Sequence, residues 1–222
     1  MLIRPGTGGR FFKKEDSMKV LLINGSPKTK GNTAFALSQM AEVFAAEGIE
    51  AETIQVGSKE IRGCIGCGSC YKSGKCVFDD LVNEVAEKFR EADGIVVGSP
   101  VYYASPNGTL ISFLDRLFYS ASYDLRMKVG ASVVVARRGG CSAAKDVLDK
   151  YFTISQMPVA SSCYWNMIHG AKPGEAQLDP EGIRTVRTLA KNMAFLMGAI
   201  AKKKSENGLP QPEPKAFTNF IR

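Results

Sequence analysis

MKVLLINGSPKTKGNT, residues 18–33, predicts a buried strand, a polar turn and the start of a helix. The apolar run at 18–23 has the length of a strand, and the Asn-Gly-Ser-Pro sequence after it is typical of a turn. Five apolar side chains then follow near helical spacing: Phe35, Leu37, Met40, Val43 and Phe44. They predict a helix that ends at Gly48, because glycine commonly terminates helices.

The same alternation continues along the chain. Further strands are predicted at 49–56, 94–103, within 128–140, and at 157–168. Further helices are predicted at 79–93, 106–119, 141–156 and 180–204. Five apolar strands that alternate with helices predict an α/β fold with a parallel sheet covered on both faces. Five strands with right-handed crossovers favour the flavodoxin-like order 2-1-3-4-5 over a six-stranded dinucleotide fold.

The domain organisation follows from length and composition. The chain has 222 residues, 45% hydrophobic and 23% charged, which fits one globular domain. We expect a flexible leader at 1–17, the flavodoxin-like domain at 18–205, and a tail at 206–222 that packs at a subunit interface. The tail ends in apolar residues that would otherwise be exposed: Phe217, Phe220 and Ile221.

Location and charge limit the classes of partner. No apolar run approaches the ~20 residues of a membrane helix, and residues 1–17 lack the apolar core of a signal peptide. We therefore expect a cytoplasmic protein, where clustered cysteines more often bind metal or do redox work than form disulfides. The net charge is +7. With no nucleic-acid-binding motif, this bias indicates either a solvated surface or an acidic partner protein.

The loop after the first strand has the composition of an anion site. Ligands of such sheets bind at the carboxyl ends of the strands, and a helix N-terminus offers free backbone N–H groups. The side chains of Ser26, Lys28, Asn32 and Thr33 add donors and charge, and Gly31 precedes the helix. The loop is neither a Walker A sequence nor G-x-G-x-x-G, so an ordinary capped turn is the alternative.

Two more loops leave the same edge of the predicted sheet. The first contains Pro100, Tyr102 and Tyr103, and a tyrosine ring there offers a stacking plane for a flat ligand. The alternative places both tyrosines in the core or on the surface. The second loop contributes charge and close backbone approach: Arg137, Arg138, Gly139 and Gly140. Phosphate donors, an aromatic plane and a glycine-lined wall together describe a flavin mononucleotide (FMN) site.

Four of the six cysteines lie in the loop at 63–76, GCIGCGSCYKSGKC. Their spacing is C-x2-C-x2-C-x5-C: Cys64, Cys67, Cys70 and Cys76. Closely spaced thiolates of this kind favour a [4Fe–4S] cluster. Zinc, a redox dithiol and a metal-free loop are the alternatives. We expect Cys141 and Cys163 to be buried side chains, and His169 to be structural or at a subunit contact.

Together, these loops resemble those of a known family. GSPKTKGNT followed by SPVYY resembles the NADPH-dependent FMN reductases, and the cysteine loop between them makes the chain similar to iron-sulfur flavoproteins. The resemblance implies that the first loop holds the FMN phosphate. It further implies that the second loop lines the isoalloxazine ring, through Pro100, Val101, Tyr102 and Tyr103. It also implies a dimer or tetramer.

The function expected from these observations is an FMN-dependent oxidoreductase. It would pass electrons between NAD(P)H or a redox protein and an acceptor such as a quinone or an oxygen species. A solvated surface is the preferred interpretation of the basic charge, although a basic surface could also attract an acidic electron-transfer protein. The alternative is a non-catalytic, flavodoxin-like electron carrier or redox sensor without a cluster. Because the cysteine loop follows the second strand, we expect it on the flavin side of the molecule. A glycine-rich loop with few large apolar residues cannot bury a cluster alone, so we also expect it near a subunit interface.

Overall fold

The computed structural model describes residues 17–214, 216 and 218. The predicted leader therefore lies outside the described residues except for Ser17. Of the tail's apolar residues, Phe217, Phe220 and Ile221 all lie outside them as well, so the interface proposed for the tail stays a prediction.

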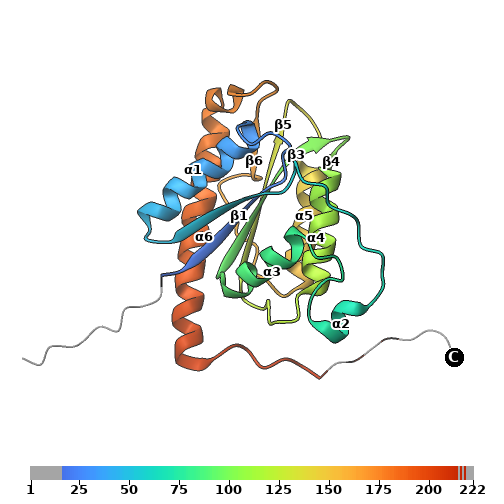
Figure 1. Cartoon of the computed structure of the whole chain (residues 1–222). Helices are drawn as coiled ribbons and strands as arrows, with labels where there is room; N and C mark the ends of the chain where they lie inside the picture. Colours follow the sequence, from blue (N-terminus) through green and yellow to red (C-terminus); the bar gives the residue numbers. More distant parts are fainter. Residues whose placement is uncertain (1–16, 215, 217, 219–222) are drawn as a thin grey trace, which may run out of the picture.

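Strands and helices alternate along the chain, as Figure 1 shows. The strands are β1 (Lys19–Asn24), β2 (Glu50–Gln55), β3 (Gly94–Tyr102), β4 (Ser105–Pro106), β5 (Val129–Ala136) and β6 (Met167–His169). The helices are α1 (Asn32–Ala46), α2 (Ser69–Ser73), α3 (Leu81–Glu91), α4 (Gly108–Ser120), α5 (Cys141–Ile154), the 3-10 helix η1 (Glu175–Leu178) and α6 (Pro180–Asn207).

The main sheet is parallel, with the order β2-β1-β3-β5-β6. Because β4 is a two-residue addition antiparallel to β3, this order is the predicted 2-1-3-4-5 of the five main strands. The α/β fold class and the flavodoxin-like order are therefore confirmed. Short elements that the sequence pattern did not predict are α2, β4 and η1.

Two hydrophobic cores cover the two faces of the sheet. Along β1, Val20 and Leu22 pack in the core beneath α1 and α6, whereas Leu21 and Ile23 pack in the core beneath α3, α4 and α5. This alternation is the period-two pattern of a strand buried on both sides. Figure 1 shows α1 and α6 on one side of the sheet and α3, α4 and α5 on the other.

The predicted fifth strand at 157–168 is largely irregular. Val159 makes a single bridge to Gly130, and regular pairing resumes only at Met167. Between them, the Ser162 hydroxyl donates to the carbonyl oxygen of Tyr164, 2.5 Å away. Side-chain bonds to the local backbone thus replace the ladder, which is why the apolar pattern overestimated this strand.

Within the described residues, no helix is both long and apolar enough to cross a membrane.

Candidate functional site

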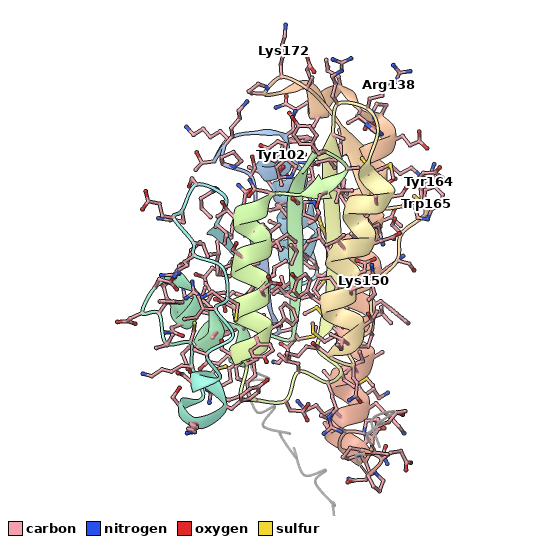
Figure 2. The ribbon with its side chains drawn as sticks, turned by 90° about the vertical axis from the view of Figure 1, so that its right-hand side faces the viewer. Tyr102, Arg138, Lys150, Tyr164, Trp165 and Lys172 are labelled. Atoms are coloured by element: carbon pink, nitrogen blue, oxygen red, sulfur yellow. The ribbon has the colours of Figure 1, made fainter. Side chains whose placement is uncertain are left out.

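A pocket of about 340 Å³ lies at the carboxyl edge of the parallel strands. This size is within the range of small-molecule sites, and the position is where ligands bind in doubly wound sheets. In Figure 2, Tyr102 and Lys172 lie at this end of the molecule. The lining residues come from four loops: Ser26, Lys28, Gly31, Asn32, Thr33, Pro100, Val101, Tyr102, Val135, Ala136, Arg137, Gly170, Ala171 and Pro173.

Hydrogen bonds fix the first loop against the sheet. Gly25 N–H donates to the Gly98 carbonyl (2.8 Å), and a side chain at Gly25 would meet that same oxygen at 2.8 Å. Only glycine therefore permits β1 to end so close to β3. The Asn24 carboxamide oxygen accepts from Ser26 N–H (3.0 Å), and Gln55 Nε2 donates to the Ser26 carbonyl (2.6 Å). Ser26 is held by both neighbouring strands.

The N-terminus of α1 faces this pocket without a cap. Gly31 occupies the N-cap position, and no side chain accepts from the first-turn N–H groups. Such groups form an anion site together with the helix dipole. Lys28 and Arg137 add positive charge at the pocket wall, and Ser26 and Thr33 are buried beside it. This donor set suits a phosphate dianion.

Asn32 ties the first loop to the loop after β6. Its Nδ2 donates to the Lys172 carbonyl (2.9 Å), and its Oδ1 accepts from the N–H groups of Gly174 (3.1 Å) and Ala176 (3.3 Å). The predicted phosphate donor Asn32 therefore lines the pocket while its amide holds another wall in place. That wall, formed by residues 170–173, was not predicted. The polar HGAKPG sequence after the predicted fifth strand could have indicated it, because it marks another loop at the same edge of the sheet.

Glu175 stabilises the same loop. Its carboxylate accepts hydrogen bonds from the N–H groups of Ala171 (2.8 Å) and Lys172 (3.0 Å). The backbone N–H of Lys172, and then that of Ala171, hold the pKa of Glu175 below its ordinary value. The charged form of Glu175 thus stabilises the loop that forms this pocket wall.

The aromatic wall comes from the β3–β4 hairpin. Pro100, Val101 and Tyr102 line the pocket, whereas Tyr103 is fully exposed at the hairpin tip. Tyr103 and Ala104 have φ angles of 50° and 59°, in the left-handed region that non-glycine residues rarely adopt. Paired positive φ angles are those of a type I′ hairpin turn, here formed without the usual Asn or Gly.

Gly140 explains how this hairpin is supported. It has φ +91°, and a Cβ placed there would lie 2.9 Å from the Cα of Ala104. Gly140 thus allows the start of α5 to touch the hairpin, while a Cβ at Gly139 would meet open space. Neither glycine lines the pocket, so their predicted contact with a flavin, like that of Tyr103, stays a prediction.

The four clustered cysteines line a second, smaller pocket, called the thiol pocket below. Its other residues are Ile65, Gly68, Val77, Phe78, Arg116, Tyr119 and Ser120. All four thiols are free. Within the described residues, no three side chains of His, Cys, Asp or Glu are grouped so as to hold a single metal ion. Thiols spread around one pocket suit a cubane, which distributes its ligands over several irons, better than one zinc ion.

The cysteine loop lies far from the first pocket, and the predicted placement on the flavin side is wrong. The loop leaves β2 at the carboxyl edge but runs along α4, where Cys70 Sγ donates to the Tyr119 carbonyl (3.7 Å) and the Ser122 hydroxyl to the Gly74 carbonyl (3.2 Å). α4 begins beside the hairpin at Gly108, and about 11 residues separate the two ends, or roughly 17 Å. Figure 1 shows α2 at the opposite end of the molecule from β4.

Arg116 anchors the cysteine loop, and the sequence pattern did not identify it. It is 1% exposed, and all its partners are in residues 62–80. Nε donates to Cys76 Sγ (3.2 Å), and two guanidinium nitrogens form a bidentate pair with Asp80 (2.7 and 2.8 Å). Arg116 could have been identified from the sequence as a single arginine within the apolar helix pattern at 106–119.

Ser120 supplies an independent test of the thiol pocket. The residue is 5% exposed, and its hydroxyl is buried without any hydrogen-bond partner among the described residues. Such orphaned groups are costly unless a bound group completes them. Sulfide or thiolate sulfur of a cluster would accept a hydrogen bond from this hydroxyl, so the residues present fit a [4Fe–4S] cluster.

The remaining candidates lie outside both pockets. Cys141 is buried at the start of α5, and burial raises the pKa of its thiol. Cys163 is exposed, which corrects the expectation that it is buried. The backbone N–H of His169 donates to Asp179 (2.7 Å), which caps α6. His169 thus lies at a structural junction.

The chain is similar to several known proteins. Residues 18–172 match the model of the family described as NADPH-dependent FMN reductase. An iron-sulfur flavoprotein of Methanocaldococcus jannaschii is 37% identical over 193 residues, which covers 83% of this chain and all of the relative. Two solved structures share the fold at low identity. The NAD(P)H:quinone oxidoreductase from Methanothermobacter marburgensis has a TM-score of 0.62 at 16% identity, covering 80% and 96% of the two chains. A flavodoxin from the domain Archaea has a TM-score of 0.52 at 17% identity, covering 79% and 99%.

Proposed function

The chain belongs to the NADPH-dependent FMN reductase family, and we propose that it is an FMN-dependent oxidoreductase that also carries a [4Fe–4S] cluster. The single observation that carries the flavin assignment is the uncapped N-terminus of α1 beside Lys28 and Arg137 in a 340 Å³ pocket. FMN, when bound, accepts a hydride or single electrons. The protein's residues bind and orient it.

Each wall of the flavin pocket has a separate role in this proposal. The N–H groups of the α1 N-terminus, with Ser26 and Thr33, bind the phosphate, and Lys28 and Arg137 offset its charge. Pro100, Val101 and Tyr102 pack against the ring, and the wall formed by residues 170–173 closes the opposite side. One anion site suits FMN, which has one phosphate, better than FAD.

The donor in this proposal is NAD(P)H or a reduced redox protein, and the acceptor is a quinone or an oxygen species. The structural neighbour from Methanothermobacter marburgensis, described as an NAD(P)H:quinone oxidoreductase, supports this pairing. Because Tyr102 is half exposed at the pocket mouth, a flat nicotinamide or quinone ring has an open approach to the flavin.

The thiols of Cys64, Cys67, Cys70 and Cys76 would hold the cluster, which supplies one-electron transfer. The name of the Methanocaldococcus relative and the orphaned hydroxyl of Ser120 support this assignment. Exposed apolar side chains border the thiol pocket, among them Ile65, Tyr71 and Val77. We propose this rim, with Lys72 and Lys75 nearby, as the face that meets either a second subunit or an acidic electron-transfer protein.

Steady-state kinetics tests the proposed activity. The anaerobically reconstituted protein should oxidise NADH or NADPH when benzoquinone is supplied, and a Ser26→Ala, Thr33→Ala double variant that loses FMN should lose this turnover. Reduction by dithionite without turnover of either nucleotide would instead favour the second candidate, a non-catalytic electron carrier. The flavodoxin neighbour is the observation that favours that candidate.

A further inference from the structure

We propose that Arg116 and Ser120 are positioning residues that donate hydrogen bonds to sulfur atoms in the thiol pocket and thereby raise the reduction potential of the bound cluster. The inference rests on the proposed function, since it requires the [4Fe–4S] cluster. It assigns a task to two side chains that the flavin chemistry does not use.

The two residues share one helical face. They are four positions apart on α4, so their side chains lie one above the other, and both line the thiol pocket. Arg116 already contacts a ligand, because its Nε–H points at Cys76 Sγ over 3.2 Å. Ser120 also lines this pocket, and its buried hydroxyl has no hydrogen-bond partner among the described residues.

Arg116 is held so that it can act only on this site. Asp80 binds two of its nitrogens, and the carbonyl oxygens of Arg62 (3.2 Å) and Phe78 (3.4 Å) accept from them as well. The guanidinium also lies 5.0 Å from the centre of the Phe78 ring. With every other donor occupied, Nε–H has a fixed direction toward Cys76.

The electrostatic consequence has a definite sign. Reduction adds one electron, and therefore one negative charge, to a cluster whose charge is carried largely by its sulfur atoms. A hydrogen bond to sulfur stabilises this more negative form. Because Asp80 neutralises the guanidinium of Arg116, the contribution of Arg116 comes from its Nε–H bond to Cys76 rather than from net charge. Removing either donor should therefore lower the potential.

The experiment uses full-length protein reconstituted anaerobically with iron and sulfide. Four forms are compared by EPR-monitored redox titration, with iron and sulfide quantified in each: wild type, Ser120→Ala, Ser120→Thr and Ser122→Ala. Ser122 is the matched control, because its hydroxyl binds the same loop at Gly74 but does not line the pocket. Arg116→Lys is the fifth form. If this variant does not fold, the Ser120 variants alone test whether hydrogen bonds to sulfur raise the cluster potential.

We expect Ser120→Ala to keep wild-type iron and sulfide, and to shift the reduced-to-oxidised ratio at fixed potential about tenfold toward oxidised, which equals a fall of about 59 mV. Ser120→Thr should restore the potential, and Ser122→Ala should not change it. A purely structural serine would lower Tm and leave the potential unchanged, and that result would overturn the inference. Wild-type protein that builds no cluster would overturn the cluster assignment itself, and the iron analysis identifies that case.

Discussion

Asn32 Nδ2 donates to the Lys172 carbonyl over 2.9 Å, which joins the first and last loops of the flavin pocket across 140 residues of sequence. The same side chain accepts from the N–H groups of Gly174 and Ala176. One amide therefore holds the wall that faces the phosphate loop. Because Asn32 lies beside the uncapped helix N-terminus, a charge introduced at this position probes what binds there.

Asn32→Ala should weaken FMN binding about tenfold, because losing the linkage costs roughly 1–2 kcal/mol. Asn32→Asp keeps acceptors for Gly174 and Ala176 but places a negative charge at the phosphate site, so FMN affinity should fall further. Fluorescence titration with FMN and with riboflavin measures both effects. Riboflavin, which has no phosphate, is the control, and an equal loss for both ligands on Asn32→Asp would contradict a phosphate at this helix end.

Removing two hydroxyls tests the phosphate loop itself. Ser26→Ala combined with Thr33→Ala should weaken FMN binding by roughly 2–4 kcal/mol, since both remove donors to a charged group. Ser38→Ala is the matched control, because its hydroxyl lies on the same helix and donates to the Phe35 carbonyl. Flavin retention after gel filtration measures the effect, and full retention in the double variant would argue against this placement.

The pH dependence of flavin binding should report Glu175. Its pKa is below the ordinary 4.5 in the folded protein, so its stabilisation of the loop is complete above that value and is lost as the pH falls through the lowered pKa. FMN affinity should therefore be flat from about pH 7 to about pH 5, as far as Glu175 contributes, and decline in stronger acid.

Glu175→Gln removes the charge and should lower FMN affinity several-fold at pH 7, while weakening that acid-dependent decline. The affinity is measured by titration across the pH range in wild type and variant. Identical curves for the two proteins would show that Glu175 does not hold the pocket wall.

The strained hairpin predicts an asymmetry between two adjacent glycines. Gly140→Ala should destabilise the fold by roughly 1–3 kcal/mol, because a left-handed residue and a contact with Ala104 are both violated. Gly139→Ala should be close to neutral, since its Cβ meets open space. Thermal unfolding measures both, with roughly 2–4 °C expected per kcal/mol. Equal Tm values for the two variants would mean that the hairpin does not need its support.

The features that were predicted correctly are those that depend on residues close together in the sequence. The strand order and the polar loop at Asn24–Thr33 follow from short-range signals, and nine of the twelve proposed flavin-site residues line one pocket. The missed parts depend on long-range contacts. The wall formed by residues 170–173 is held by hydrogen bonds with Asn32, Glu175 and the Ala136 carbonyl, and no sequence motif predicts these contacts.

The cysteine loop shows the same limit. About 25 residues separate β2 from α3, and a connection of that length can cross the molecule. Its destination depends on the ion pair between the buried Arg116 and the partly exposed Asp80, and an arginine in a helix pattern is normally expected at the surface. The direction of a long loop is therefore set by its anchor rather than by the strand that it follows.

The composition of the loaded protein tests the central proposal most directly. Protein reconstituted anaerobically should contain, per chain, one flavin released by acid as FMN, with about four iron and about four acid-labile sulfide. FAD in place of FMN would contradict the pocket assignment. Zinc, or no metal, in the presence of intact thiols of Cys64, Cys67, Cys70 and Cys76 would contradict the cluster.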